Sequence, residues 1–199
     1  ANRSEKFRRT DPKWELIIKL GKKLKAEAKK DNMSAKIEII KGDITKLETD
    51  AIVNAANNSL LGGGGVDGAI HRAAGKELLE ECKKLNGCET GDAKITSAYK
   101  LPAKHVIHTV GPVWKGGNNN EIELLESCYK SSLEIAEEYK LQSIAFPNIS
   151  TGIYAFPKEK AAEIAIKTVL ALSAEFQHLK KIIFCCFDDE NYDLYKKMI

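Results

Sequence analysis

The sequence predicts an α/β domain in which helices cover both faces of a largely parallel sheet. Five short, apolar segments rich in β-branched residues have the length and composition of strands: 37–40, 51–54, 106–110, 143–146 and 182–187. Segments with helical periodicity lie between them, and strands that alternate with helices of this length are typical of parallel sheets. Residues 182–187 are apolar almost without interruption, which predicts a central strand buried on both faces.

The first 34 residues differ from the rest of the chain in charge. They hold eleven Lys and Arg against five Asp and Glu, or +6, whereas residues 35–199 hold twenty against twenty-three, or −3. Apolar residues recur with a helical period over residues 13–28, after Asp11 as an N-cap and Pro12 at the first helical position. We therefore expect a basic helical N-terminal extension at residues 1–34 and a main domain at residues 35–199. A solvated helix face is expected for the extension, with contact to nucleic acid or an acidic partner as the alternative.

Helices of the main domain are expected from the spacing of its apolar residues. Over residues 121–139, the side chains that fall on one face are Ile122, Leu125, Tyr129, Leu133 and Ala136. Over residues 158–174, they are Ala162, Ala165, Ile166, Val169 and Leu170. A shorter helix is expected at residues 66–74, directly after a run of glycines.

Composition excludes several classes of protein. With 43% hydrophobic and 30% charged residues, the chain has the profile of a globular protein. Its apolar stretches are far shorter than the roughly 20 residues that cross a bilayer, so no membrane partner is expected. Residues 35–199 lack the basic balance that duplex DNA requires, so a nucleic-acid partner is not expected either. No coiled-coil pattern is present, and a monomer is the expectation.

The five cysteines are odd in number and show no Cys-x-x-Cys spacing. This pattern argues against structural zinc and against a disulfide framework, and it favours a reducing compartment. Cys185 and Cys186 lie in an apolar run, where buried packing is expected. We expect an intracellular protein of the cytoplasm or nucleus, and mitochondrial targeting by a removed N-terminal segment stays open.

Five of the fourteen glycines fall within residues 62–68. Four adjacent glycines carry a large entropic cost on ordering, so a specific backbone geometry is expected to need them. Bare amide N–H groups followed by a helix N-terminus would bind a phosphate. The alternative is a flexible loop.

The same glycines formally satisfy the dinucleotide fingerprint at Gly63, Gly65 and Gly68, which makes a Rossmann oxidoreductase the second hypothesis. Two observations argue against it. Seven residues separate the strand at 51–54 from Gly62, whereas the fingerprint directly follows its strand. The fingerprint also requires an acidic residue that binds the ribose, about 20 residues after the glycines. The nearest candidates, Glu89 and Asp92, lie in a turn-like segment.

A second loop, at residues 150–154, follows the strand at 143–146 and offers further N–H groups and hydroxyls. Ligands of open α/β sheets bind at the carboxyl ends of the strands. Two anion-binding loops at that edge predict a site for a diphosphate, and a simple β–α turn is the alternative.

Polar side chains follow the predicted strands at the same edge. Asp43 comes after the first strand, where its carboxylate could accept from an exocyclic amine or cap a turn. Asn54 and Asn57 bracket two alanines at the end of the second strand. Asp67 starts a helix, where carboxylates commonly stabilise, yet a carboxylate beside a diphosphate is electrostatically unfavourable. Asp67 is therefore expected to bind ribose hydroxyls or a water.

Two histidines are candidates for proton transfer. His108 falls within a predicted strand and is expected to be a satisfied core residue. His71 lies one helical turn after Asp67, and packing beneath the pocket is favoured over facing it.

At these residues the sequence resembles the macrodomain family, and within it the MacroD-type ADP-ribosyl hydrolases. The matching segments are Gly-Asp-Ile-Thr at 42–45, Asn-Ala-Ala-Asn at 54–57 with the glycine loop, His-Thr-Val-Gly-Pro at 108–112, and Ile-Ser-Thr-Gly-Ile-Tyr at 149–154. Together they span about residues 36–198. The resemblance implies a three-layer α/β/α fold with a central mixed, mostly parallel sheet that binds ADP-ribose.

Position by position, the resemblance implies contacts along the whole ligand. Asp43 would bond the adenine amine, Ile44 would contact the ring through its backbone, and Phe187 would flank it. The implied diphosphate cradle is formed by Gly62, Gly63, Gly64, Gly65, Val66, Ser150, Thr151, Gly152 and Ile153. The region of the distal ribose is formed by Ala55, Ala56, Asn57, Asp67 and Tyr154. Ile149 and Ala155 flank the second loop, and Ala155 stands where many relatives have glycine.

The implied reaction is hydrolysis of the bond between the distal ribose and an acidic side chain of a mono-ADP-ribosylated protein, with O-acetyl-ADP-ribose as a related substrate. Asn57 and Asp67 are the implied catalytic residues, which orient water and ribose. Either Asp67 or the ligand's own phosphate takes the proton. The family's chemistry needs no metal and no cofactor. The alternative is a non-catalytic reader of ADP-ribosylated proteins, which would need the cradle and Asp43 but not the catalytic pair.

Overall fold

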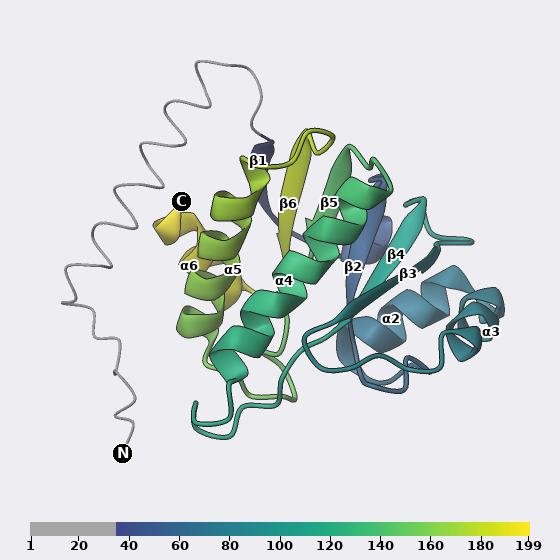
Figure 1. Ribbon diagram of the computed structural model, residues 1–199, viewed down its shortest axis with the longest axis horizontal. Helices are drawn as coiled ribbons and strands as arrows, with labels where there is room; N and C mark the ends of the chain where they lie inside the picture. Colours follow the sequence, from purple (N-terminus) through teal and green to yellow (C-terminus); the bar gives the residue numbers. More distant parts are fainter. Residues whose placement is uncertain (1–34) are drawn as a thin grey trace.

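A computed structural model describes residues 35–199 of the chain (Figure 1). The basic helical extension expected at residues 1–34 lies outside these described residues. Between residues 35 and 199, no helix combines the length and the apolar character needed to cross a membrane.

One sheet of six strands, in the order β1-β6-β5-β2-β4-β3, forms the centre of the described domain. Along the chain the strands are β1 (Lys36–Lys41), β2 (Ala51–Ala56), β3 (Ala93–Ser97), β4 (His105–Val110), β5 (Ser143–Phe146) and β6 (Lys181–Cys186). All neighbours pair in parallel except β3, which runs antiparallel to β4 at one edge. The mixed, mostly parallel sheet is thereby confirmed. Because β1, β2, β5 and β6 run in one direction, the loops that follow them meet at one edge of the sheet.

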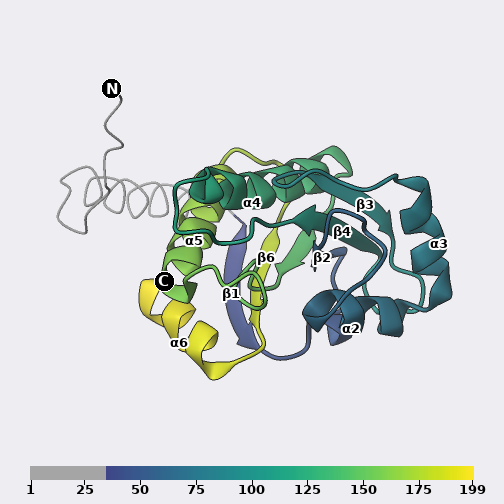
Figure 2. The same cartoon turned by 90° about the horizontal axis from the view of Figure 1, so that it is seen from below.

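Helices cover both faces of this sheet. On one face, α4 (Glu121–Glu138), α5 (Lys158–Ser173) and α6 (Asp189–Met198) share a buried core with strand residues such as Phe146 and Phe184. On the other, α2 (Gly65–Ala74) and α3 (Lys76–Lys84) pack on strand residues such as Ile52 and Val106. Figure 2 shows α4 and α2 on opposite sides of the strands. The three-layer α/β/α architecture is confirmed.

Aromatic contacts fix the ends of β5 and β6, from which two of the site loops start. The ring centroids of Tyr129 and Phe146 lie 5.2 Å apart, those of Phe146 and Phe184 6.2 Å, and those of Phe184 and Tyr195 4.9 Å. All four side chains are buried. Pairs of this geometry each add roughly 0.5–1.5 kcal/mol beyond the burial of their surface. These contacts therefore pack β5 and β6 against α4 and α6, next to the loops that follow the two strands.

Most of the expected elements are confirmed to within one or two residues, but two details of the strands are corrected. The second strand continues two residues past Asn54, because Ala55 and Ala56 pair with β4, so five residues rather than seven precede Gly62. Residues 182–186 of the apolar run are buried as expected, but Phe187 is not, and β6 lies second from an edge of the sheet rather than at its centre. Phe187 follows this strand and is 82% exposed.

The sequence patterns do not predict β3, α3 or α6. The strand β3 lies at an edge and buries only Thr96 fully, so its pattern is weak. The helix α3 buries only Leu78 and Cys82 among charged neighbours. The helix α6 is fixed by Asp188, whose side chain accepts a 2.8 Å hydrogen bond from the backbone N–H of Asn191. Each element has too few apolar positions for periodicity to indicate it.

Candidate functional site

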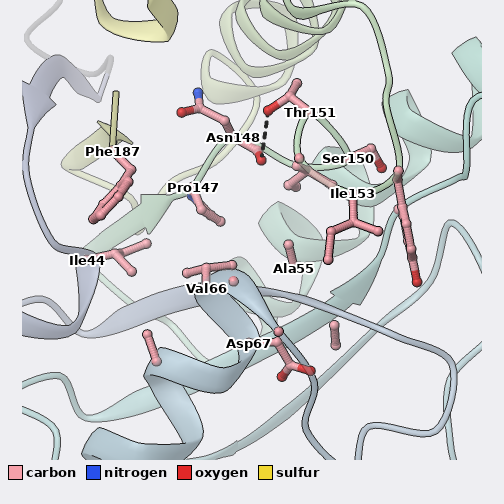
Figure 3. Close-up of a pocket in the computed structure, with 18 of the residues that line it drawn as sticks. Ile44, Ala55, Val66, Asp67, Pro147, Asn148, Ser150, Thr151, Ile153 and Phe187 are labelled. Atoms are coloured by element: carbon pink, nitrogen blue, oxygen red, sulfur yellow. Dashed lines mark hydrogen bonds between the residues drawn. The ribbon is translucent and has the colours of Figure 1, made fainter. Parts of the chain in front are cut away.

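The loops after β1, β2, β5 and β6 surround a cleft of about 700 Å³. Two of its walls are the glycine loop (residues 57–64) and the serine loop (residues 147–155), which lie opposite each other (Figure 3). Ile153 of the serine loop reaches toward the other wall: its Cδ1 lies 3.6 Å from the position that a Cβ on Gly64 would take. A concave site of this size suits a nucleotide-sized ligand.

Asn57 holds the glycine loop from within. Its Oδ1 accepts hydrogen bonds from the backbone N–H and the hydroxyl of Ser59, at 3.1 and 2.6 Å. Its Nδ2 donates to the carbonyl of Gly62 at 3.0 Å. The chain then enters α2 through Gly65, whose φ of +57° is a left-handed conformation that glycine adopts without steric cost. Loop amides followed by a helix N-terminus form an arrangement that favours anions.

Asp67 lies in the first turn of α2 and is only 3% exposed. Its Oδ1 accepts a 2.7 Å hydrogen bond from Asn54 Nδ2 and lies 3.5 Å from His71 Nε2. Its Oδ2 has no hydrogen-bond partner within residues 35–199. That oxygen would lie 3.0 Å from a Cβ on Gly63, and Asn57 Nδ2 would lie 3.2 Å from the same Cβ. Burial raises the pKa of Asp67, while the Asn54 hydrogen bond and the nearby His71 offset part of that increase.

A buried chain of polar side chains lies behind Asp67. Asn54 on β2 is opposite His108 on β4, and Asn54 Nδ2 lies 3.1 Å from His108 Nδ1. His108 Nε2 lies 2.9 Å from the hydroxyl of Thr96 on β3. Burial lowers the pKa of His108 to about 3, so this ring is neutral at neutral pH. The hydrogen bonds then assign Nδ1 as the acceptor from Asn54 and Nε2 as the donor to Thr96.

The two histidines lie where the sequence indicates. His108 is fully buried within β4, so its interpretation as a satisfied sheet residue is confirmed. The His71 side chain is 12% exposed and packs against the Gly62 main chain, with Cδ2 3.7 Å from the position of a Cβ there. Packing rather than direct exposure to the cleft is therefore confirmed for His71 as well.

Main-chain bonds and a close contact hold the serine loop. The backbone N–H of Phe156 donates to the carbonyl of Ser150 at 3.0 Å, and that of Trp114 donates to the carbonyl of Tyr154 at 2.8 Å. Ser150 itself has a φ of +64°. A Cβ on Gly111 would overlap the Ser150 hydroxyl, so the loop approaches β4 as closely as a glycine there allows.

Ile44 and Phe187 lie together at the far end of the cleft from Asp67 (Figure 3), and Asp43, which directly precedes Ile44, also lines the cleft. Asp43 also has a structural role: its Oδ1 accepts hydrogen bonds from the backbone N–H and hydroxyl of Thr45, at 2.9 and 2.7 Å. The Thr45 hydroxyl holds the pKa of Asp43 below its usual range. The turn-capping interpretation of Asp43 is therefore correct, and it leaves the carboxylate in the cleft wall.

Seventeen of the nineteen residues expected to bind ligand line this one cleft. They are Asp43, Ile44, Ala55, Ala56, Asn57, Gly63, Gly64, Gly65, Val66, Asp67, Ile149, Ser150, Thr151, Gly152, Ile153, Tyr154 and Phe187. Gly62 and Ala155 are the two exceptions. The Gly62 carbonyl is bound by Asn57, and Ala155 closes a turn by donating its N–H to the Gly152 carbonyl at 2.9 Å.

Several residues of the cleft wall are not indicated by the sequence as contacts. They include Arg72, Asn148, Lys158, Asp188 and Asn191. Gly111 also lines the cleft. It belongs to the segment 108–112, which matches the family resemblance, so that motif could have indicated it. The others come from α2, α5, α6 and the loops beside them, and no local pattern separates them from ordinary surface residues.

The cysteines offer no nucleophile in the described domain. All five are buried. Burial raises the pKa of Cys82, Cys128 and Cys186 to about 11 and that of Cys185 to about 12, so these thiols stay protonated. Within residues 35–199, no three His, Cys, Asp or Glu side chains form a group that could hold a metal ion.

Replacing Ala155 with glycine is expected to stabilise the protein. Ala155 has a φ of +54°, a left-handed conformation that is strained for a residue with a Cβ. We expect Ala155→Gly to raise the free energy of unfolding by about 1 kcal/mol, which thermal denaturation would record as an increase in Tm. Ala155→Val is the matched control and should lower Tm, because a β-branched residue suits this conformation least. Equal Tm values for both variants would contradict the assignment of strain.

Comparison with known proteins identifies the family. Residues 53–165 match the family model of the Macro domain. The chain belongs to the Macro domain family. A Macro domain-containing protein of Chlorobaculum tepidum is 63% identical to this macrodomain over 163 residues, which are 82% of this chain and 95% of that protein.

Two further relatives bear on activity and ligand. The ADP-ribose glycohydrolase MACROD2 of Mus musculus is 58% identical over 170 residues, which are 84% of this chain and 36% of that protein. A solved variant of the Oceanobacillus iheyensis macrodomain with ADPR superposes with a TM-score of 0.80 at 44% identity, over 83% of this chain and 92% of that one.

Proposed function

We propose that this macrodomain binds ADP-ribose and hydrolyses the ester bond between ADP-ribose and glutamate or aspartate side chains of proteins. O-acetyl-ADP-ribose, which carries the same kind of ester, is proposed as a second substrate. Mono-ADP-ribosylated proteins are the proposed partners, and the reaction is proposed to need no metal. The name of the mouse relative and the ADPR in the solved macrodomain support this class of activity.

The observation that carries the proposal is the buried Asp67 carboxylate beside the glycine loop, in the lining of the cleft. A buried carboxylate with one oxygen unpartnered is costly, because desolvation is not compensated at that oxygen. Its Oδ2 lies beside the main chain of Gly63, at the end of the proposed phosphate cradle. A ligand that brings a hydroxyl or a water to that oxygen would remove the cost.

The proposed ligand lies along the cleft in a single direction. Adenine would lie at Asp43 and Phe187, and the diphosphate would be held by main-chain N–H groups of Gly63–Val66 and of residues 150–153. The distal ribose would then reach Asn57 and Asp67. In Figure 3, Val66 of the proposed cradle lies between Phe187 and Asp67. Anion binding by amides and a helix N-terminus explains how a cradle of small residues could hold a diphosphate.

In the proposed reaction, a water attacks C1 of the distal ribose. The bond from the water oxygen to C1 forms, the bond from C1 to the ester oxygen breaks, and its electron pair stays on the departing carboxylate. The proton of the water goes to Asp67 Oδ2. A carboxylate is a stable leaving group, so no protonation by a general acid is required. Asn57 would fix the glycine loop and the ribose during the attack.

A turnover assay on a protein that carries glutamate-linked ADP-ribose tests the proposal. We expect free ADP-ribose to accumulate over many turnovers, at a rate unchanged by EDTA, and O-acetyl-ADP-ribose to be consumed as well. Tight binding of ADP-ribose without release from the modified protein would instead indicate a non-catalytic reader. An EDTA-sensitive rate would contradict metal independence alone.

A further inference from the structure

A second hollow, of about 440 Å³, adjoins the cleft on the far side of the glycine loop. We call it the side hollow. It is lined by Leu61, Gly62, Gly63, Gly68, His71, Arg72, Gly75, Lys76 and Leu79. Gly63 and Arg72 line both the side hollow and the main cleft, so the two spaces meet at these residues. Of the residues that line the side hollow, only Gly63 belongs to the proposed contacts with ADP-ribose.

Two exposed cations line the side hollow. Arg72 is exposed at the end of α2, and Lys76 is exposed at the start of α3. No carboxylate within residues 35–199 forms an ion pair with either side chain, whereas Lys83 and Lys104 nearby are each paired. Both cations line the same hollow without an ion pair, so an anionic partner seated there could pair with both.

Arg72 lies over the junction with the reaction site. A Cβ on Gly68 would stand 3.0 Å from Arg72 Nη1 and 2.5 Å from the carbonyl oxygen of Gly63. A Cβ on Gly63 itself would lie 3.0 Å from Asp67 Oδ2 and 3.2 Å from Asn57 Nδ2. Gly63 is therefore close to both the Arg72 guanidinium and Asp67 Oδ2, so a group that leaves the distal ribose at Asp67 departs near the guanidinium.

We propose that the side hollow binds the acidic protein segment that carries the ADP-ribose, with Arg72 bound to the departing carboxylate and Lys76 to neighbouring carboxylates. This inference rests on the proposed function. The ester carbonyl is neutral before the reaction, and the carboxylate oxygen gains a full negative charge as its bond to C1 breaks. An arginine contact that strengthens during bond breaking lowers the barrier, and a guanidinium matches the two oxygens of a carboxylate.

Peptides with one glutamate-linked ADP-ribose, flanked either by glutamates or by glutamines, test this role. We expect Arg72→Gln to lower kcat/KM about 10- to 100-fold on both peptides, and Arg72→Lys to restore only part of it. Lys76→Gln should lower kcat/KM several-fold on the glutamate-flanked peptide alone. The matched control is Lys84→Gln, which removes one exposed charge at the other end of α3 and should behave as the wild type.

Two binding measurements separate this inference from the proposed function. The affinity for ADP-ribose, measured by calorimetry, should change less than about twofold in Arg72→Gln, and a tenfold loss would assign Arg72 to the main cleft and overturn the inference. The affinity of unmodified glutamate-rich peptide for the ADP-ribose-saturated protein should fall in Arg72→Gln and Lys76→Gln. If both the peptide affinity and kcat/KM are unchanged in Arg72→Gln and Lys76→Gln, the inference is also overturned. If the wild type releases no ADP-ribose, the proposed function fails, and the peptide affinities still decide whether the side hollow binds acidic segments.

Discussion

Replacing Asp67 with asparagine is expected to lower the turnover of glutamate-linked ADP-ribose by a factor of about 10² to 10⁴, the range of general-base catalysis. Asparagine has the same shape and can still accept the 2.7 Å hydrogen bond from Asn54 Nδ2. It cannot take a proton from water. The affinity for ADP-ribose should be retained or increased, because a negative charge near the diphosphate is removed. Single-turnover kinetics and calorimetry on the same preparation provide both quantities.

The stability of Asp67→Asn provides an internal control. Burial raises the folded-state pKa of Asp67 above the ordinary value of 3.8, so the contribution of this group to stability is fully present below that value and is lost as the pH rises through the folded-state pKa. At pH 7 the variant should therefore be at least as stable as the wild type. An inactive variant with an unchanged or higher Tm would assign the loss to chemistry. Full activity in Asp67→Asn would instead point to the ligand's phosphate as the base.

Replacing Asn54 with valine is expected to impair both folding stability and the reaction. The substitution removes the donor to Asp67 Oδ1 and the donor to His108 Nδ1, and both acceptors are buried. Leaving such groups unpaired is expected to cost about 3 kcal/mol. Because the Asn54 hydrogen bond lowers the pKa of Asp67, its loss should raise that pKa further. The acidic limb of the pH–rate profile should therefore move to higher pH.

Thr96→Val is the matched control for Asn54→Val. It removes the partner of His108 Nε2 at the other end of the same chain of side chains, but it keeps the bond from Asn54 to Asp67. We expect Thr96→Val to lower Tm without moving the acidic limb of the profile. A shift of the limb in both variants, or in neither, would contradict the direct effect of Asn54 on Asp67.

The glycine run and the residues near it could be predicted from sequence because their chemistry is local. Four adjacent glycines, a carboxylate in the next helical turn and paired asparagines before them are all within fifteen residues of one another. The strand that leads into the second loop is equally visible, since Ile144, Ala145 and Phe146 form a short apolar segment. The edge at which the two loops meet then follows from the parallel direction of the strands.

The contacts behind and beside the site could not be predicted in the same way. Asn54 meets His108, and His108 meets Thr96, only through the registers of β2 with β4 and of β4 with β3. The edge strand β3 has no clear alternation of apolar and polar residues, so its register with β4 could not be predicted from the sequence. Arg72 looks like any exposed helical arginine until the fold brings it to Gly63. Asn57 is proposed to contact the ribose and also donates a hydrogen bond to the Gly62 carbonyl. The second role depends on how the loop folds and could not be predicted from the sequence.

A crystal structure of the wild-type protein soaked with ADP-ribose tests the central claim most directly. The account predicts that main-chain N–H groups of Gly63–Val66 and of residues 150–153 lie within hydrogen-bond distance of the phosphate oxygens. It also predicts that C1 of the distal ribose, or a water in line with it, lies next to Asp67 Oδ2. A diphosphate held by Lys158 or Arg72 away from these amides, or a distal ribose remote from Asp67, would contradict it.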